Sequence, residues 1–135
     1  MVQSPQELVS TLKAQHRSLQ ADLSAALDGT NSALALTKFR NDLLEHLQLE
    51  NEVFYPDYLE KQGKKGEDVT KTKEFIKQMD DIGNVVMAFL NKYNAAEAIT
   101  ATTEDFKKEL ETIIRTLNLR IETEEEGVFG LYLLM

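Results

Sequence analysis

The chain of 135 residues contains no cysteine, and this absence excludes disulfide frameworks, zinc sites built from thiolates and cysteine nucleophiles. It also lacks a long apolar run. The longest strongly apolar stretch, Val128 to Met135, is far too short to span a bilayer. The first residues carry neither a basic flank nor an apolar segment, so we expect no secretory signal and a cytoplasmic protein.

Positive charge is scarce, because 15 Lys and Arg residues face 23 Asp and Glu residues and the net charge is −8. Binding to the backbone of a nucleic acid depends mainly on basic contacts, so this class of function is excluded. Docking on an anionic membrane surface is excluded for the same reason. The apolar fraction of 42% is ordinary for a globular protein, and the length fits a single domain over residues 1–135.

Helix signals recur along the whole chain. At the start, Ser4 can cap a helix, Pro5 suits the first helical position and Glu7 completes a capping box. This first helix should run to about Leu27, before the turn residues 28–31. No segment alternates with a period of two, so no strand is predicted. The other predicted helices cover residues 32–53 with a remnant to 61 after Pro56, residues 68–93, and residues 102 to beyond 125, with a small-residue connection at 94–101.

Each predicted helix has one apolar stripe with spacings of three and four residues. Four helices of about 20 residues or more, each with one stripe and short links, predict an all-α, antiparallel up-down-up-down four-helix bundle. The stripes contain Leu8, Leu12, Leu19, Leu23 and Leu27; Leu36, Phe39, Leu43 and Val53; Phe75, Met79, Ile82, Val86 and Phe89; and Phe106, Leu110, Ile113, Leu117 and Val128.

Five positions with the spacing of these stripes hold polar instead of apolar side chains: His16, His46, Glu50, Arg120 and Glu124. A buried polar group requires a partner, and a buried charge requires one even more. The chain has only two histidines, and both lie on inward faces. A layer of imidazole and carboxylate from facing helices is how bundles build metal sites, and it suits iron, manganese or zinc.

The segments 46–54 and 120–129 echo each other, since each has a polar core residue, a Glu four positions later and a Val-Phe pair further on. This similarity predicts two related helical hairpins that face each other across the polar layer. Of the acidic residues 122 and 124–126, only Glu124 is expected to point inward. Tyr55 and Tyr58 are expected to pack at the end of the bundle.

The pattern resembles the hemerythrin-like (HHE cation-binding) family over nearly the whole chain, from Leu8 to Phe129. The family has a lone His on the first helix, His-x-x-x-Glu on the second, a His on the third and His-x-x-x-Glu on the fourth. His16 matches the first position, His46 and Glu50 followed by residues 54–56 match the second-helix motif, and Glu124 matches the last carboxylate. In the family these residues hold a non-heme di-iron centre that binds dioxygen or senses oxygen, redox state or iron, and the resemblance implies non-heme iron here, as one or two atoms.

Two positions depart from the family pattern, because Met79 stands in the place of the third-helix His and Arg120 in that of the fourth. Met is a soft ligand for iron, and Arg cannot ligate at all. These replacements favour a layer without metal, in which Arg120 bridges Glu50 and Glu124 and Met79 fills the volume of a His. Loss of such an arginine would cost on the order of 3–5 kcal/mol.

The sequence therefore leaves two main functions open. One is a cation-binding or sensing module whose metal ligands are His16, His46, Glu50 and Glu124. The other is a metal-free structural or protein-interaction bundle, with a protein partner or a second copy as its target. An iron-dependent, oxygen-using enzyme is a weaker alternative. We assign no catalytic residue and expect no enzyme, because nothing in the sequence indicates a substrate cavity.

Overall fold

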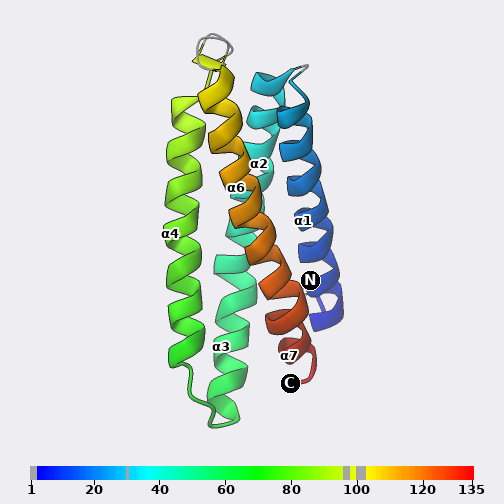
Figure 1. Cartoon of the computed structure of the whole chain (residues 1–135). Helices are drawn as coiled ribbons and strands as arrows, with labels where there is room; N and C mark the ends of the chain where they lie inside the picture. The colour runs from blue at the N-terminus through cyan, green and yellow to red at the C-terminus, as the bar shows by residue number, and fades with distance from the viewer. Residues whose placement is uncertain (1–2, 30, 96–97, 100–102) are drawn as a thin grey trace.

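The computed structural model describes residues 3–29, 31–95, 98–99 and 103–135, and no strand occurs among them. Four helical rods run up, down, up and down the bundle (Figure 1), which confirms the all-α four-helix class. No helix in the described part of the chain is long and apolar enough to cross a membrane. The elements are α1 (Pro5–Asp28), α2 (Ser32–Leu49), the π-helical turn η1 (Glu50–Phe54), α3 (Tyr55–Lys64), α4 (Thr70–Lys92), α6 (Thr103–Thr123), the π-helical turn η2 (Glu124–Val128) and α7 (Phe129–Leu133).

The ends of the helices follow the local sequence signals. The Ser4 hydroxyl accepts a hydrogen bond from the Glu7 backbone N–H at 3.1 Å, which confirms the predicted cap. Gly29 ends α1 in the left-handed conformation at φ 84°. Thr30 of the predicted turn, Thr102 and much of the connection at 94–101 lie outside the described residues.

Pro56 does not end the second rod, which continues through α3 as far as Lys64. The proline follows directly on η1, where the Tyr55 backbone N–H donates to the carbonyl of Glu50, five residues back. This wider turn leaves room for a proline ring, which would clash with the carbonyl four residues before it in a regular helix.

The two π turns change which side chains face the core. Each inserts one extra residue, so the inward face moves from Val53 to Phe54 and from Val128 to Phe129. Phe54 and Phe129 are 0% and 1% exposed, whereas Val53 is 40% exposed. The predicted core position of Val53 is therefore wrong, because an unbroken 3.6-residue period does not continue past η1. Leu27 is exposed as well, and Ala26 takes its place in the core.

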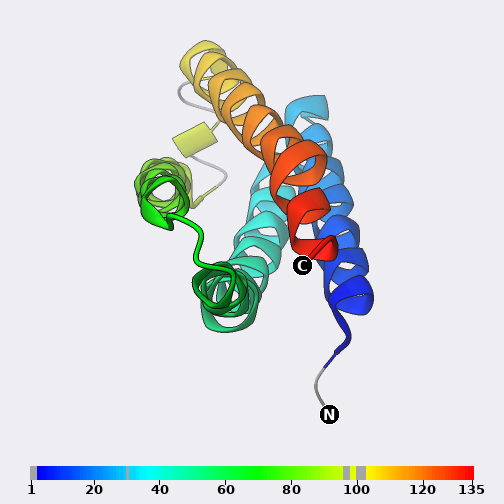
Figure 2. The same ribbon diagram turned by 90° about the horizontal axis from the view of Figure 1, so that it is seen from below.

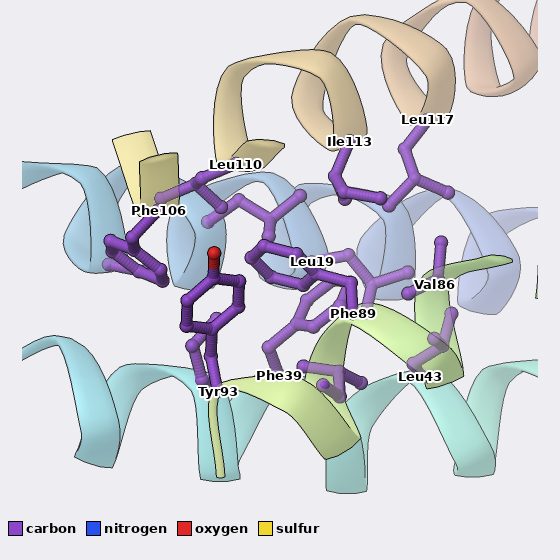
Figure 3. Close-up of a cluster of buried hydrophobic side chains, with 14 residues drawn as sticks. Leu19, Phe39, Leu43, Val86, Phe89, Tyr93, Phe106, Leu110, Ile113 and Leu117 are labelled. Carbon is purple, nitrogen blue, oxygen red and sulfur yellow. The ribbon is translucent and has the colours of Figure 1, made fainter. Parts of the chain in front are cut away.

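Two apolar clusters fill the bundle, one toward each end. In the first, the rings of Phe39, Phe89, Tyr93 and Phe106 gather between α2, α4 and α6 (Figure 3). The second holds Leu8, Val9, Leu12, Phe54, Tyr55, Tyr58, Phe129 and Tyr132. The polar positions of the stripes lie between these clusters along every rod that carries them. The polar layer is thus enclosed by apolar material on both sides.

The helix α4 stands to one side of the other rods (Figure 2), and its burial is uneven. Its fully buried residues, Val86, Phe89 and Leu90, all lie in the second half. In the first half, Phe75 and Met79 are only half-buried, although both belong to the predicted stripe. The part of α4 that runs alongside the polar layer is consequently held by fewer apolar contacts than α1, α2 or α6.

We expect the register shift at η1 to appear as a difference between two neighbouring truncations. Phe54→Ala removes a fully buried ring and should lower the free energy of unfolding by about 3–5 kcal/mol. Val53→Ala should change it by less than about 1 kcal/mol, because that residue is 40% exposed and lies outside the core. Urea unfolding followed by circular dichroism measures both, and equal losses would contradict the π turn.

Candidate metal centre

The structure brings together all four side chains that the sequence assigns to a metal. His16 comes from α1 and His46 from the last turn of α2, while Glu50 and Glu124 are the first residues of η1 and η2. All four are at most 2% exposed. Each offers one ligand atom, and these atoms all lie within 4.8 Å of one another. The predicted ligand layer therefore exists as a compact, desolvated cluster.

The imidazole of His16 is held by two carboxylates. Its Nδ1 lies 2.7 Å from Oε2 of Glu125, which also accepts a hydrogen bond from Arg17 at the surface. A carboxylate can only accept here, so Nδ1 carries a proton and donates it to Glu125. The Nε2 of the same ring lies 3.1 Å from Oε1 of Glu124.

His46 is arranged in the same way by different partners. Its Nδ1 donates to Oε1 of Gln15 at 2.7 Å, and its Nε2 faces Oε1 of Glu50 at 3.2 Å. Burial, and after it the nearby His16, lowers the pKa of His46 to about 4. The ring is thus neutral at pH 7, with a free lone pair on Nε2, which is the form that binds metals.

The four potential ligand atoms, Nε2 of both histidines and one carboxylate oxygen of each glutamate, therefore face one another at the centre of the layer. His16 Nε2 and both oxygens of Glu50 make no hydrogen bond within the described part of the chain. Unpaired buried acceptors are costly, and each costs about 1–3 kcal/mol. A cation placed among them would satisfy all of them at once. The donor set therefore fits a metal ion, and the Nδ1 partners are the outer-shell acceptors that metal-bound histidines normally have.

The two carboxylates have opposite proton affinities. Burial, and then Glu124, raises the pKa of Glu50 well above its ordinary value. Burial would also raise the pKa of Glu124, but Glu50, His16 and Tyr55 together lower it to about 2. The Tyr55 hydroxyl contributes by donating to Oε2 of Glu124 at 2.5 Å. Glu124 is therefore ionised at neutral pH, while the raised pKa of Glu50 favours its protonated form, and that proton would have to leave when a cation binds.

Arg120 does not bridge Glu50 and Glu124, and this part of the sequence interpretation is wrong. Its guanidinium turns to α4, where Nη2 donates to the carbonyl of Phe75 at 2.6 Å and Nε to Sδ of Met79 at 2.7 Å. The same group stacks on the ring of Phe75, 3.6 Å from its centroid. The half-packed first half of α4 offers these partners near the surface, so the guanidinium avoids the cost of full desolvation beside the cluster.

A small cavity of about 30 Å³ adjoins the cluster. Its wall includes His16, His46 and Glu124, and also the two replaced positions, Met79 and Arg120. The rest of the lining is apolar, from residues such as Ile82, Val86 and Leu117. A space of this size accommodates a water-sized molecule.

Three residues that contact the ligands are not predicted by the sequence pattern. The pattern places Glu125 in solvent, gives Tyr55 only a packing role and assigns nothing to Gln15. Gln15 and Glu125 each adjoin a candidate ligand in the sequence, which is the only signal that could have pointed to them. Tyr55 reaches Glu124 because η1 rotates it inward, and a π turn is not visible in a hydrophobic pattern.

Comparison with known families gives one match. The model of the Hemerythrin HHE cation binding domain matches residues 7–132, which is nearly the whole chain. No curated protein and no solved structure matches the chain.

We expect Arg120 to hold α4 rather than to neutralise the carboxylates. In Arg120→Gln, the loss of its contacts to α4 should cost about 1–2 kcal/mol. That loss corresponds to roughly 5–30-fold faster amide exchange at residues 70–83, measured by hydrogen–deuterium exchange. Arg115→Gln, on an exposed face of the same helix, is the control. If Arg120→Gln instead lowered the free energy of unfolding by about 3–5 kcal/mol and accelerated amide exchange in all four helical rods, Arg120 would bridge the carboxylates.

Proposed function

This chain belongs to the hemerythrin HHE cation-binding family, and on that premise we propose that it binds iron through His16, His46, Glu50 and Glu124. One observation carries the proposal. Two imidazole Nε2 atoms face carboxylate oxygens at 3.1 and 3.2 Å, with both ring protons directed away from the cluster. A metal ion among these atoms would compensate all of them at once, and no Lys or Arg among the described residues forms an ion pair with Glu50 or Glu124.

Iron agrees with the chemistry of these donors. Two carboxylates and two imidazoles suit iron, manganese or zinc, and the hard oxygen donors favour the harder ions. Bound iron would supply redox and dioxygen chemistry at this point of the bundle. The chain's own residues prepare the site for the ion. Glu125 and Gln15 accept the Nδ1 hydrogen bonds of His16 and His46, and the contacts of Glu124 keep that carboxylate ionised. The two apolar clusters keep bulk water away from the layer.

We further propose a binding or sensing role rather than an enzymatic one. The cavity beside the cluster, of about 30 Å³, suits a small molecule such as dioxygen rather than an organic substrate. Oxygen, redox state or iron itself would be the signal. A partner protein would then read the state of the bundle.

The metal-free interpretation has lost its main support. It required a guanidinium within the layer to compensate the carboxylates, and Arg120 is bonded to α4 instead. Without that bridge, His16 Nε2 and the oxygens of Glu50 have no hydrogen-bond partner within the described part of the chain, and a metal-free layer depends on the proton that the raised pKa of Glu50 favours.

Iron binding can be tested by elemental analysis of protein produced with added iron. We expect near-stoichiometric metal and near-ultraviolet charge-transfer absorption after exposure to air. Glu50→Gln, which keeps the shape of the side chain and removes its charge, should lose both. Glu126→Gln is the matched control, since Glu126 is exposed and lies on η2. Metal-free protein under reducing and aerobic conditions alike would contradict the proposal.

Glu125 and Gln15, which accept hydrogen bonds from the two imidazole rings, should influence the affinity for the metal without contacting it. We expect Gln15→Ala and Glu125→Ala to weaken metal binding by roughly 10–100-fold, because each leaves a histidine without its orienting acceptor. Competition with a coloured chelator measures the affinity. Glu122→Ala, on the exposed face of the same helical rod, serves as the reference, and an effect of equal size there would point to general electrostatics.

A further inference from the structure

Building on the proposed cation site, we infer that this chain holds a single metal ion rather than a pair. We further infer that Tyr55 is the positioning residue that limits Glu124 to one ligand oxygen. Both points depend on the groups that surround the four ligand side chains.

The first observation concerns the two oxygens of Glu124. Oε1 faces Nε2 of His16 at 3.1 Å, while Oε2 accepts a hydrogen bond from the Tyr55 hydroxyl at 2.5 Å. A carboxylate that bridges two ions gives one oxygen to each. Because Oε2 already accepts the phenol proton, one of its lone pairs is used and it is the weaker donor toward a second ion, so Oε1 is the oxygen that Glu124 offers to a metal.

The position of the phenol is fixed by packing. Tyr55 is 3% exposed, and its ring contacts those of Phe54 and Phe75 with centroids 4.8 and 6.3 Å away. The π turn η1 sets its direction, since the Tyr55 backbone N–H bonds to the carbonyl of Glu50. The hydroxyl therefore cannot leave Oε2 without moving the aromatic cluster around it.

The second observation concerns the two replaced positions. Met79 and Arg120 contact each other, with Nε of the arginine 2.7 Å from Sδ of the methionine. The loss of ligands is thus confined to one side of the layer, next to α4. A second cation there would meet no nitrogen donor and a permanent positive charge, which repels it. On the other side, His16 and His46 remain together, with ring centroids 4.7 Å apart.

The remaining donors suffice for one ion. Both oxygens of Glu50 are without hydrogen-bond partners among the described residues, so this carboxylate can offer either one or two oxygens. With Nε2 of each histidine and Oε1 of Glu124, a single ion has four or five protein donors. Such a mixed nitrogen and oxygen set suits one iron or manganese ion.

Metal stoichiometry decides between one ion and two. Metal-free protein is incubated anaerobically with excess Mn(II), freed of unbound metal and examined by elemental analysis and electron paramagnetic resonance. We expect one Mn(II) per chain with the spectrum of an isolated ion. Two ions with coupled hyperfine lines would overturn the inference and leave cation binding intact. No bound Mn(II), together with no bound Fe(II), would overturn the proposed function and this inference with it.

Variants test the role of Tyr55 separately. Met79→His combined with Arg120→His restores two nitrogen donors, and we expect it to take up a second Mn(II). Adding Tyr55→Phe frees Oε2 of Glu124 and should tighten that second ion by roughly tenfold or more. Adding Tyr58→Phe instead is the control, since Tyr58 packs in the same aromatic cluster. If the variants with Tyr55→Phe and with Tyr58→Phe bound the second Mn(II) with equal affinity, the role of Tyr55 would be overturned.

Tyr55→Phe alone provides a measurement that does not depend on the His replacements. Freed of its hydrogen bond, Glu124 can turn both oxygens to the single ion, so the zero-field splitting of bound Mn(II) should change. Tyr58→Phe should leave the spectrum as in the parent. An unchanged spectrum in both, with the helical circular dichroism intact, would also overturn the positioning role.

Discussion

Two carboxylates and two imidazoles share a dry layer in the middle of this bundle, and the rest of the structure is arranged around that constraint. Apolar clusters lie on both sides of the layer, so bulk water has little access to its polar groups. The folding free energy gained in the clusters must offset the cost of desolvating the layer. Since both Nδ1 protons have acceptors outside the cluster, the inward atoms are left facing one another, as the proposed cation site requires.

The two π turns connect this layer to the second apolar cluster. Each begins at a candidate ligand carboxylate and rotates the residues after it, so that Phe54, Tyr55 and Phe129 close the layer on one side. The turn η1 thus positions the candidate ligand Glu50, the Tyr55 hydroxyl that is bonded to Glu124, and part of the core. π turns are frequent at functional sites, and here their physical contribution is this change of register.

The helix α4 carries no metal ligand, and its packing against the layer is correspondingly weak. Met79 supplies no donor, and the first half of α4 has no fully buried side chain, so Arg120 connects it to α6 through hydrogen bonds and ring stacking. The side of the layer next to α4 is therefore the more weakly held one, and the small cavity lies against it. The asymmetry between the two sides of the layer arises from two residues of the sequence.

The periodicity of Leu, Phe and Val by itself determined the four rods, and the polar residues that interrupt it determined His16, His46, Glu50 and Glu124 as the candidate ligands. These features depend on spacing within a single helix, which a linear sequence records directly. Only the tertiary structure decided the direction of Arg120, the inward turn of Tyr55 and the partners of the two ring protons. Those depend on contacts between rods and on a π turn, where side chains compete for desolvated space, and no spacing along one chain encodes that competition.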